Sequence, residues 1–158
     1  MTTDYLDHLA AICGDYGIPK ENLVVVDDVA KAAVEFGWES GGMDNDRRRL
    51  AKIQHNIEPP IIILKRTIDW DFATDLARHI PCSVDERQRR VAGGLDRRWF
   101  LTHLILHEIG HYVLGHHMKT MDDYPDASSE AEVRFLKERE ADWWAIGEME
   151  RRRNAQTE

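Results

Sequence analysis

The chain has 158 residues, enough for a hydrophobic core of its own and too few for two full-sized domains, so we expect a single domain over residues 1–158. Its 21 basic and 29 acidic side chains leave a formal net charge of −8, which argues against a protein that grips nucleic acid directly through its phosphates. The two cysteines, Cys13 and Cys82, form no C-x-x-C pair, so neither a disulfide framework nor a thiolate zinc site is indicated.

The first part of the chain predicts two short helices and one short strand. Apolar residues at helical spacing predict a helix over residues 3–13, and the run LVVV at residues 23–26 predicts a strand. Asp27 or Asp28 can then cap a helix that ends at Gly37.

The middle of the chain predicts a mixture of helix and strand. Asp44 or Asn45 can cap a short helix whose apolar side chains are Leu50, Ile53 and Ile57. The β-branched run EPPIIILK at residues 58–65 predicts a strand, and its two prolines fit either the start of a strand or an edge strand, which is the preferred interpretation. Residues 69–80 are compatible with a helix that Pro81 stops.

Two longer helices follow. One is predicted from about Asp96 to Leu114, and the other begins at Ser128 or Ser129, where Ser129 and Glu132 make a capping box. With the short strands before them, these helices predict an α+β fold: a small, mostly helical domain with a short β-sheet.

Two features argue against a secreted or membrane-bound protein. Asp4 and Asp7 stand where a secretory signal carries positive charge. The longest nearly apolar run, residues 99–113, contains histidines and a glutamate, so it is too polar to span a membrane. We therefore expect a cytoplasmic protein with no membrane contact.

The segment HEIGH carries the strongest chemical signal. His107 and His111 are four residues apart on a predicted helix, so both imidazoles leave the same face and can bind one metal ion. Glu108 is angled to one side, where its carboxylate can take a proton from water on the metal. This spacing is typical of zinc peptidases.

Catalytic zinc usually takes three protein ligands, so a third must lie elsewhere. His117 falls where metzincins place a third histidine, but their pattern requires glycine where Leu114 stands. Glu138 and Asp142 share a helix face, which would let Glu138 bind the metal while Asp142 accepts a hydrogen bond from a ligating histidine. Glu140 points about 160° away from Asp142, so Glu138 is the preferred ligand.

The other histidines have simpler interpretations. His103 lies one helical turn before His107 and could fall near the site, but a packed core residue is the preferred interpretation. His116 and His117 are expected to interact with the last carbonyls of their helix. The sequence does not choose which residue would stabilise an oxyanion; the candidates are His116, His117, Tyr112 and Tyr124. Three histidines have no partner at ligand spacing and receive no role: His8, His55 and His79.

HEIGH and the later segment EREADWWA together resemble the ImmA/IrrE metallopeptidases, whose pattern is H-E-x-x-H followed by E-x-E-A-[ND]-x-F-A. The resemblance is close over roughly the last 65 residues. It implies that His107, His111 and Glu138 hold Zn²⁺, with Glu108 as general base. The E-x-x-x-D spacing of related gluzincins matches Glu138 and Asp142.

The same resemblance implies a function and a partner. The expected activity is zinc-dependent endopeptidase cleavage of a regulatory protein, typically a separately encoded helix-turn-helix repressor. Two alternatives remain open: a metalloprotease with a phage or housekeeping role, and a non-catalytic module that keeps the zinc fold in order to bind a regulator.

Overall fold

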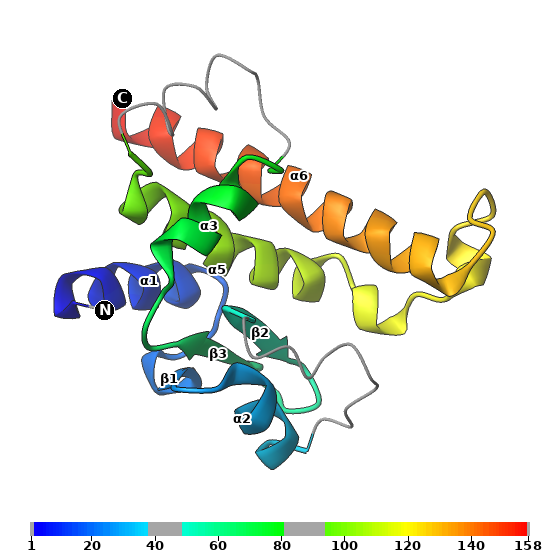
Figure 1. Ribbon diagram of the computed structural model, residues 1–158, viewed down its shortest axis with the longest axis horizontal. Helices are drawn as coiled ribbons and strands as arrows, with labels where there is room; N and C mark the ends of the chain where they lie inside the picture. The colour runs from blue at the N-terminus through cyan, green and yellow to red at the C-terminus, as the bar shows by residue number, and fades with distance from the viewer. Residues whose placement is uncertain (1, 38–48, 81–93, 158) are drawn as a thin grey trace. The chain divides into compact units, whose positions relative to one another are not determined.

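The computed structural model describes residues 2–37, 49–80 and 94–157 (Figure 1). Cys82 lies outside these residues. The chain divides into two compact units, Met1–Ala73 and Thr74–Glu158, here called the N-terminal and the C-terminal unit. The expected α+β class is confirmed, because helices account for most of the described residues and a single three-stranded sheet for the strands. A single domain stays a prediction.

The sheet of the N-terminal unit has the strand order β1-β3-β2. Strand β1 (Leu23–Val26) runs parallel to β3 (Ile61–Lys65), and β2 (Ala51–Gln54) runs antiparallel to it. The edge position expected for β3 is therefore wrong, since this strand is central. Its two prolines precede the strand, so every residue of β3 keeps its N–H for pairing.

A second sequence prediction also fails in this unit. The short helix expected around Leu50, Ile53 and Ile57 is not formed, because Ala51–Gln54 is strand β2. Ile53 pairs with Ile62 across the sheet and is buried. Tertiary pairing thus overrides the local helical spacing, as β-branched side chains favour a buried pleated surface. The proposed caps, Asp44 and Asn45, lie outside the described residues.

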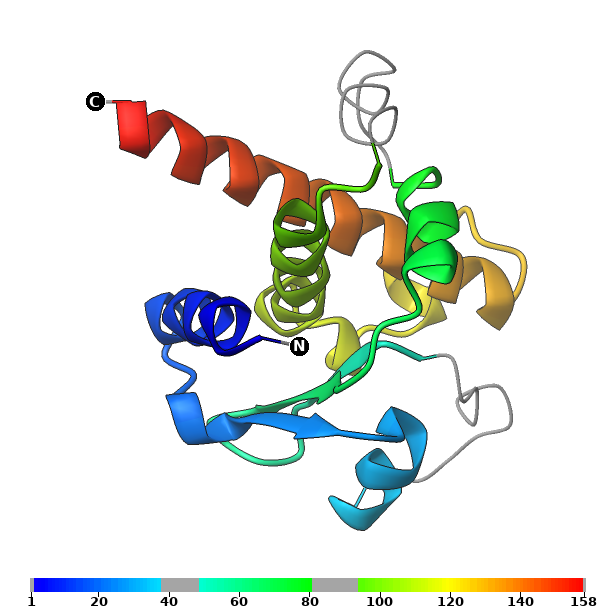
Figure 2. The ribbon, with the colours of Figure 1, turned by 60° about the vertical axis from the view of Figure 1, so that its left-hand side comes forward.

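The helices of the N-terminal unit follow the sequence closely. Helix α1 (Thr3–Asp15) and helix α2 (Val29–Glu35) lie on opposite sides of the sheet (Figure 2). Asp28 is the N-cap of α2, because its side chain accepts a hydrogen bond from the backbone N–H of Lys31 at 3.0 Å. Three residues of α2 pack against Ile63 of β3 in one core cluster: Val29, Ala32 and Ala33.

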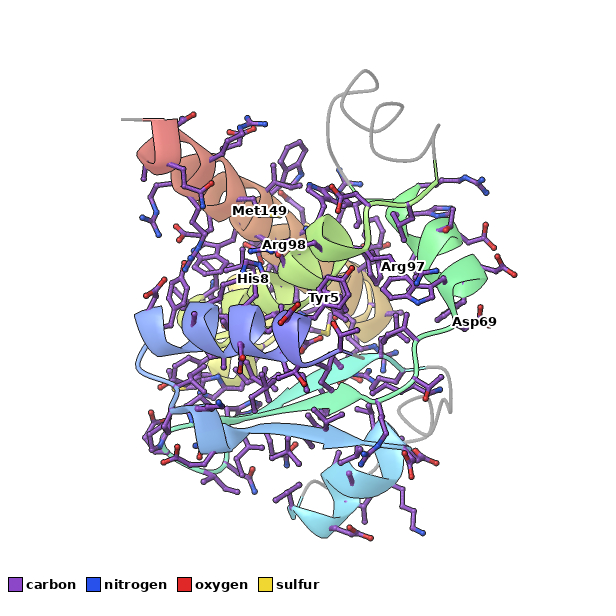
Figure 3. All side chains as sticks on the ribbon, turned by 90° about the vertical axis from the view of Figure 1, so that its left-hand side faces the viewer. Tyr5, His8, Asp69, Arg97, Arg98 and Met149 are labelled. Atoms are coloured by element: carbon purple, nitrogen blue, oxygen red, sulfur yellow. The ribbon has the colours of Figure 1, made fainter. Side chains whose placement is uncertain are left out.

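Helix α3 (Trp70–Ala77) spans the boundary between the units, in a stretch whose sequence was compatible with a helix. The C-terminal unit is built on α5 (Arg97–Val113) and α6 (Glu130–Thr157). Asp96 caps α5 by accepting from the N–H of Trp99, and Arg97 and Arg98 project from its first turn (Figure 3). Two single turns connect the helices, η3 (His116–Met118) and η4 (Met121–Asp123).

Helices α5 and α6 pack against each other and cross at a clear angle, as a comparison of the two views shows (Figures 1 and 2). Their contact uses small residues: a Cβ added at Gly110 would lie 3.0 Å from the Trp144 ring and 3.3 Å from the carbonyl oxygen of Ala141. Ala141 and Ala145 are fully buried on α6. This close approach lets side chains from one helix reach those of the other. No helix within the described ranges is long and apolar enough to span a membrane.

Candidate metal centre

Three side chains converge between α5 and α6. Nε2 of His107 lies 3.1 Å from Nε2 of His111, and it lies 2.8 Å from Oε2 of Glu138. Nε2 of His111 lies 3.2 Å from the other Glu138 oxygen. The two histidines are one turn apart on α5, and Glu138 faces them from α6. The three residues expected as ligands are thus brought together and form a group that could hold a metal ion.

The donor atoms fit a tetrahedral metal in both spacing and chemistry. Ligands bound to zinc at about 2.0–2.1 Å in tetrahedral geometry lie about 3.3 Å apart, close to the separations seen here. Asp142 accepts a hydrogen bond from Nδ1 of His107, so the neutral ring has a bare lone pair on Nε2. A proton on Nε2 of His107 can be donated to the Glu138 carboxylate, and a metal cation bound among these atoms would replace that proton.

Asp142 joins two histidines of α5. Its Oδ1 lies 2.7 Å from Nδ1 of His107 and 3.1 Å from Nε2 of His103. The role expected for Asp142, as acceptor for a ligating histidine, therefore matches its position. His103 is buried and stacks on Trp99, with the ring centroids 5.8 Å apart, so it is both a core residue and a hydrogen-bond partner.

Electrostatics in this cluster are strongly perturbed. Burial by itself lowers the pKa of His107, but hydrogen bonds to Asp142 and Glu138, with the charges of Glu108 and Glu138, outweigh it and raise that pKa to about 10. Burial by itself raises the pKa of Asp142, but its hydrogen bonds to His103 and His107 outweigh burial and lower that pKa to about 2. Burial likewise raises the pKa of Glu138, but hydrogen bonds to His107 and His111 outweigh burial and hold that pKa well below its usual value. The carboxylates of Glu138 and Asp142 therefore stay ionised at neutral pH.

His111 has a different partner behind it. Its Nδ1 lies 2.7 Å from Nδ1 of His116, whose other ring nitrogen lies 3.2 Å from Oε1 of Glu140. Tyr124 donates a hydrogen bond to the same Glu140 oxygen at 2.5 Å. Burial and the neighbouring His111 lower the pKa of His116 to about 4, which keeps this imidazole neutral. Burial and the Glu140 carboxylate raise the pKa of Tyr124.

Glu108 is buried on α5, next in sequence to His107. Its charge is one of the causes that raise the pKa of His107, so it acts on the candidate centre electrostatically. Its role as general base stays a prediction.

The remaining histidines lie outside the candidate metal groups of the described residues. His117 is exposed and stacks on Tyr112, with 6.5 Å between the ring centroids. This position agrees with the preference for Glu138 over His117 as the third ligand. His8 projects from α1 of the N-terminal unit (Figure 3). Nδ1 of His79 lies 2.8 Å from the carbonyl oxygen of Asp75 at the end of α3.

Sequence reasoning missed two residues around the centre. His103 was expected to be a packed core residue, which its burial confirms, and His116 to interact with the last carbonyls of its helix. Their contacts with Asp142 and His111, respectively, were not predicted. A signal existed for His103, because it precedes His107 by one helical turn. None existed for His116, whose position depends on how the chain turns at Gly115, where φ is 67°.

Comparison with known proteins adds no relative: no protein-family model, no curated protein and no solved structure matches this chain.

Proposed function

We propose that the protein is a zinc-dependent peptidase of the ImmA/IrrE kind, with His107, His111 and Glu138 as ligands. The observation that carries the proposal is the convergence of two Nε2 atoms and one carboxylate within 3.2 Å of one another. Two imidazoles and one carboxylate are a ligand set used by hydrolytic zinc sites. Glu138 keeps 59 % of its side-chain surface exposed, which suits a centre that must admit water and substrate.

The residues around the ligands have distinct tasks in this proposal. Zinc held by these three residues would supply Lewis acidity, which lowers the pKa of water and polarises a peptide carbonyl. The Glu108 carboxylate would accept a proton from the attacking water and later pass it to the leaving amine. Asp142 holds His107 in the tautomer that offers Nε2 to the metal.

The proposed substrate is a regulatory protein, namely a separately encoded helix-turn-helix repressor that is cut rather than degraded. This part of the proposal rests on the resemblance of HEIGH and EREADWWA to the ImmA/IrrE pattern. The net charge of −8 favours a protein partner over direct contact with DNA.

The test separates metal binding from catalysis. Glu108→Gln is expected to keep stoichiometric zinc, measured by elemental analysis. Its cleavage of a helix-turn-helix repressor that the wild-type protein cuts is expected to be at least about a hundredfold slower, since the general base is gone. A Glu108→Gln protein that still cleaves at the wild-type rate would contradict the proposed mechanism. If neither protein cleaves but both control the regulator in cells, the protein is a binding module instead.

The ligand set has its own test. Glu138→Ala is expected to lose zinc, whereas His117→Ala is expected to retain it, because His117 stacks on Tyr112 and belongs to no candidate metal group. The reverse result would make His117 the third ligand.

A further inference from the structure

We propose that His116 and Glu140 form a support chain for the metal ligand His111, and that they set how tightly the centre holds zinc; this inference rests on the proposed function. The chain runs from Nδ1 of His111 to Nδ1 of His116 at 2.7 Å, and from Nε2 of His116 to Oε1 of Glu140 at 3.2 Å. Both residues act through His111 and are positioning residues.

One arrangement of protons satisfies the whole chain. A His111 that binds metal through Nε2 carries its proton on Nδ1, so it donates to His116. His116 then accepts at Nδ1 and must carry its own proton on Nε2, which faces a carboxylate. A carboxylate only accepts, so Glu140 fixes the tautomer of His116, and His116 fixes that of His111.

The middle residue of this support chain, His116, is buried. His116 is only 4 % exposed, and its Nε2 is a buried nitrogen with no hydrogen-bond partner in the described part of the chain. Oε1 of Glu140 is its ionic contact, at 3.2 Å. The contact is electrostatic: the Glu140 carboxylate favours the proton on Nε2 of His116, and with it the tautomer of His116 that His111 requires.

The chain also connects the centre to the segment between the two helices. Tyr124, which follows η4, donates to the same oxygen of Glu140 that faces His116. The backbone of Lys119 in this segment accepts a hydrogen bond from Nζ of Lys137 on α6 at 2.8 Å. The two histidine ligands thus have separate supports: Asp142 for His107, and His116 with Glu140 for His111.

The experiment measures zinc affinity by competition with a chromophoric chelator, on folded full-length protein. Glu140→Gln keeps the shape of the side chain and removes its charge, and it is expected to weaken zinc binding about tenfold or more. The matched control is Glu130→Gln, which removes the same charge from the first turn of α6 and is expected to leave the affinity unchanged. Equal affinities for the Glu140→Gln and Glu130→Gln proteins would overturn the proposal.

Double variants test whether the residues form one chain. His116→Phe is expected to weaken zinc binding roughly 10–100-fold, and adding Glu140→Gln to it should cause little further loss. Adding Asp142→Asn to Glu140→Gln should instead multiply the two losses, because these carboxylates support different ligands. If the losses of zinc affinity from His116→Phe and Glu140→Gln were fully additive, the two residues would not act through one support chain, and the proposal would be contradicted.

Two further measurements separate the possible failures. A merely structural role for Glu140 would lower the unfolding midpoint of the zinc-free protein and leave the zinc affinity unchanged, which would overturn the proposal. If wild-type protein binds zinc through His107, His111 and Glu138 but Glu140→Gln has no effect, only the support chain falls. If wild-type protein binds no zinc, the proposed function falls with it.

Discussion

Three carboxylates of α6 stand two residues apart and face different partners. Glu138 and Asp142 are four residues apart and meet the same histidine, His107, at its two ring nitrogens. Glu140 points to another side of the helix and contacts His116. Helical geometry explains the division, because side chains at i and i+4 share a face and the one between them does not.

The buried thiol of Cys13 allows a prediction that is independent of the metal. Burial raises the pKa of Cys13 from 9.0 to about 11, and the side chain is fully buried. We therefore expect no alkylation by iodoacetamide in the native protein at pH 8, and rapid alkylation after unfolding, since the thiolate is the reactive form. Mass spectrometry of a Cys82→Ser protein isolates this site.

The same shift has a consequence for stability. The unfolded thiol ionises from about pH 9 while the folded one stays protonated, so the free energy of unfolding is expected to fall as the pH rises from 9 towards 11. Cys13→Ala should remove this part of the decline in an alkaline denaturation series. An identical slope with and without the thiol would contradict the assigned burial.

At the scale of elements, the centre depends on how closely α5 and α6 approach. The proposed ligands come from both helices, so their separation is set by the interface at Gly110, Ala141 and Ala145. A larger residue at this interface is expected to push the two helices apart and to increase the distance between Glu138 and the two histidines of α5, His107 and His111. Packed interiors transmit such shifts because they contain little free volume.

Substitution of one glycine tests this dependence. Gly110→Ala is expected to destabilise the protein by about 1–3 kcal/mol and to weaken zinc binding, because its Cβ would meet Trp144 at 3.0 Å and the Ala141 backbone at 3.3 Å. The control is Gly147→Ala on α6, where the new Cβ meets nothing within 4 Å. That change is expected to stabilise the protein by roughly 0.5–1 kcal/mol and to leave zinc affinity as it is. Chemical denaturation and chelator competition measure both quantities.

For the whole molecule, the proposed zinc binding would be linked to folding. A ligand that binds only the native state adds RT ln(1 + [L]/Kd) to the free energy of unfolding, about 2.7 kcal/mol at a hundredfold excess over Kd. We expect zinc to raise the unfolding midpoint of the wild-type protein and a chelator to reverse the increase. His107→Ala protein should show no zinc-dependent shift.

The pH dependence of this stabilisation has a definite sign. The pKa of His107 is raised to about 10, so in zinc-free protein the proton stabilises the fold below about pH 6.5 and this contribution is lost as the pH rises through 10. Zinc must displace that proton, so its affinity is expected to increase with pH, by up to about tenfold per unit, between pH 6 and 9. Titrations at fixed ionic strength check the slope, and a flat profile would contradict the protonation of His107.

Local patterns alone predicted several elements correctly. Asp96 and Asp28 are good N-caps before apolar periodic runs, and the helices begin after them as expected. Glu132 also lies at a helix start, but its carboxylate accepts from Ser128, while its N–H donates to Ser129. These features depend on neighbours within one turn, so sequence is sufficient to find them.

The strands required longer-range information. Residues 51–54 have apolar spacing compatible with a helix, and only pairing with β3 makes them a strand. The central place of β3 likewise depends on two partners, one of them far earlier in the chain. Such pairings compete with local propensity and usually prevail.

The candidate centre divides in the same way. Sequence by itself determined that His107 and His111 share a helix face, and that Glu138 and Asp142 share another, because a helix repeats every 3.6 residues. Only the tertiary structure decided that these two faces meet, and that His116 lies behind His111, because both depend on the packing of α5 against α6 and on the turn at Gly115.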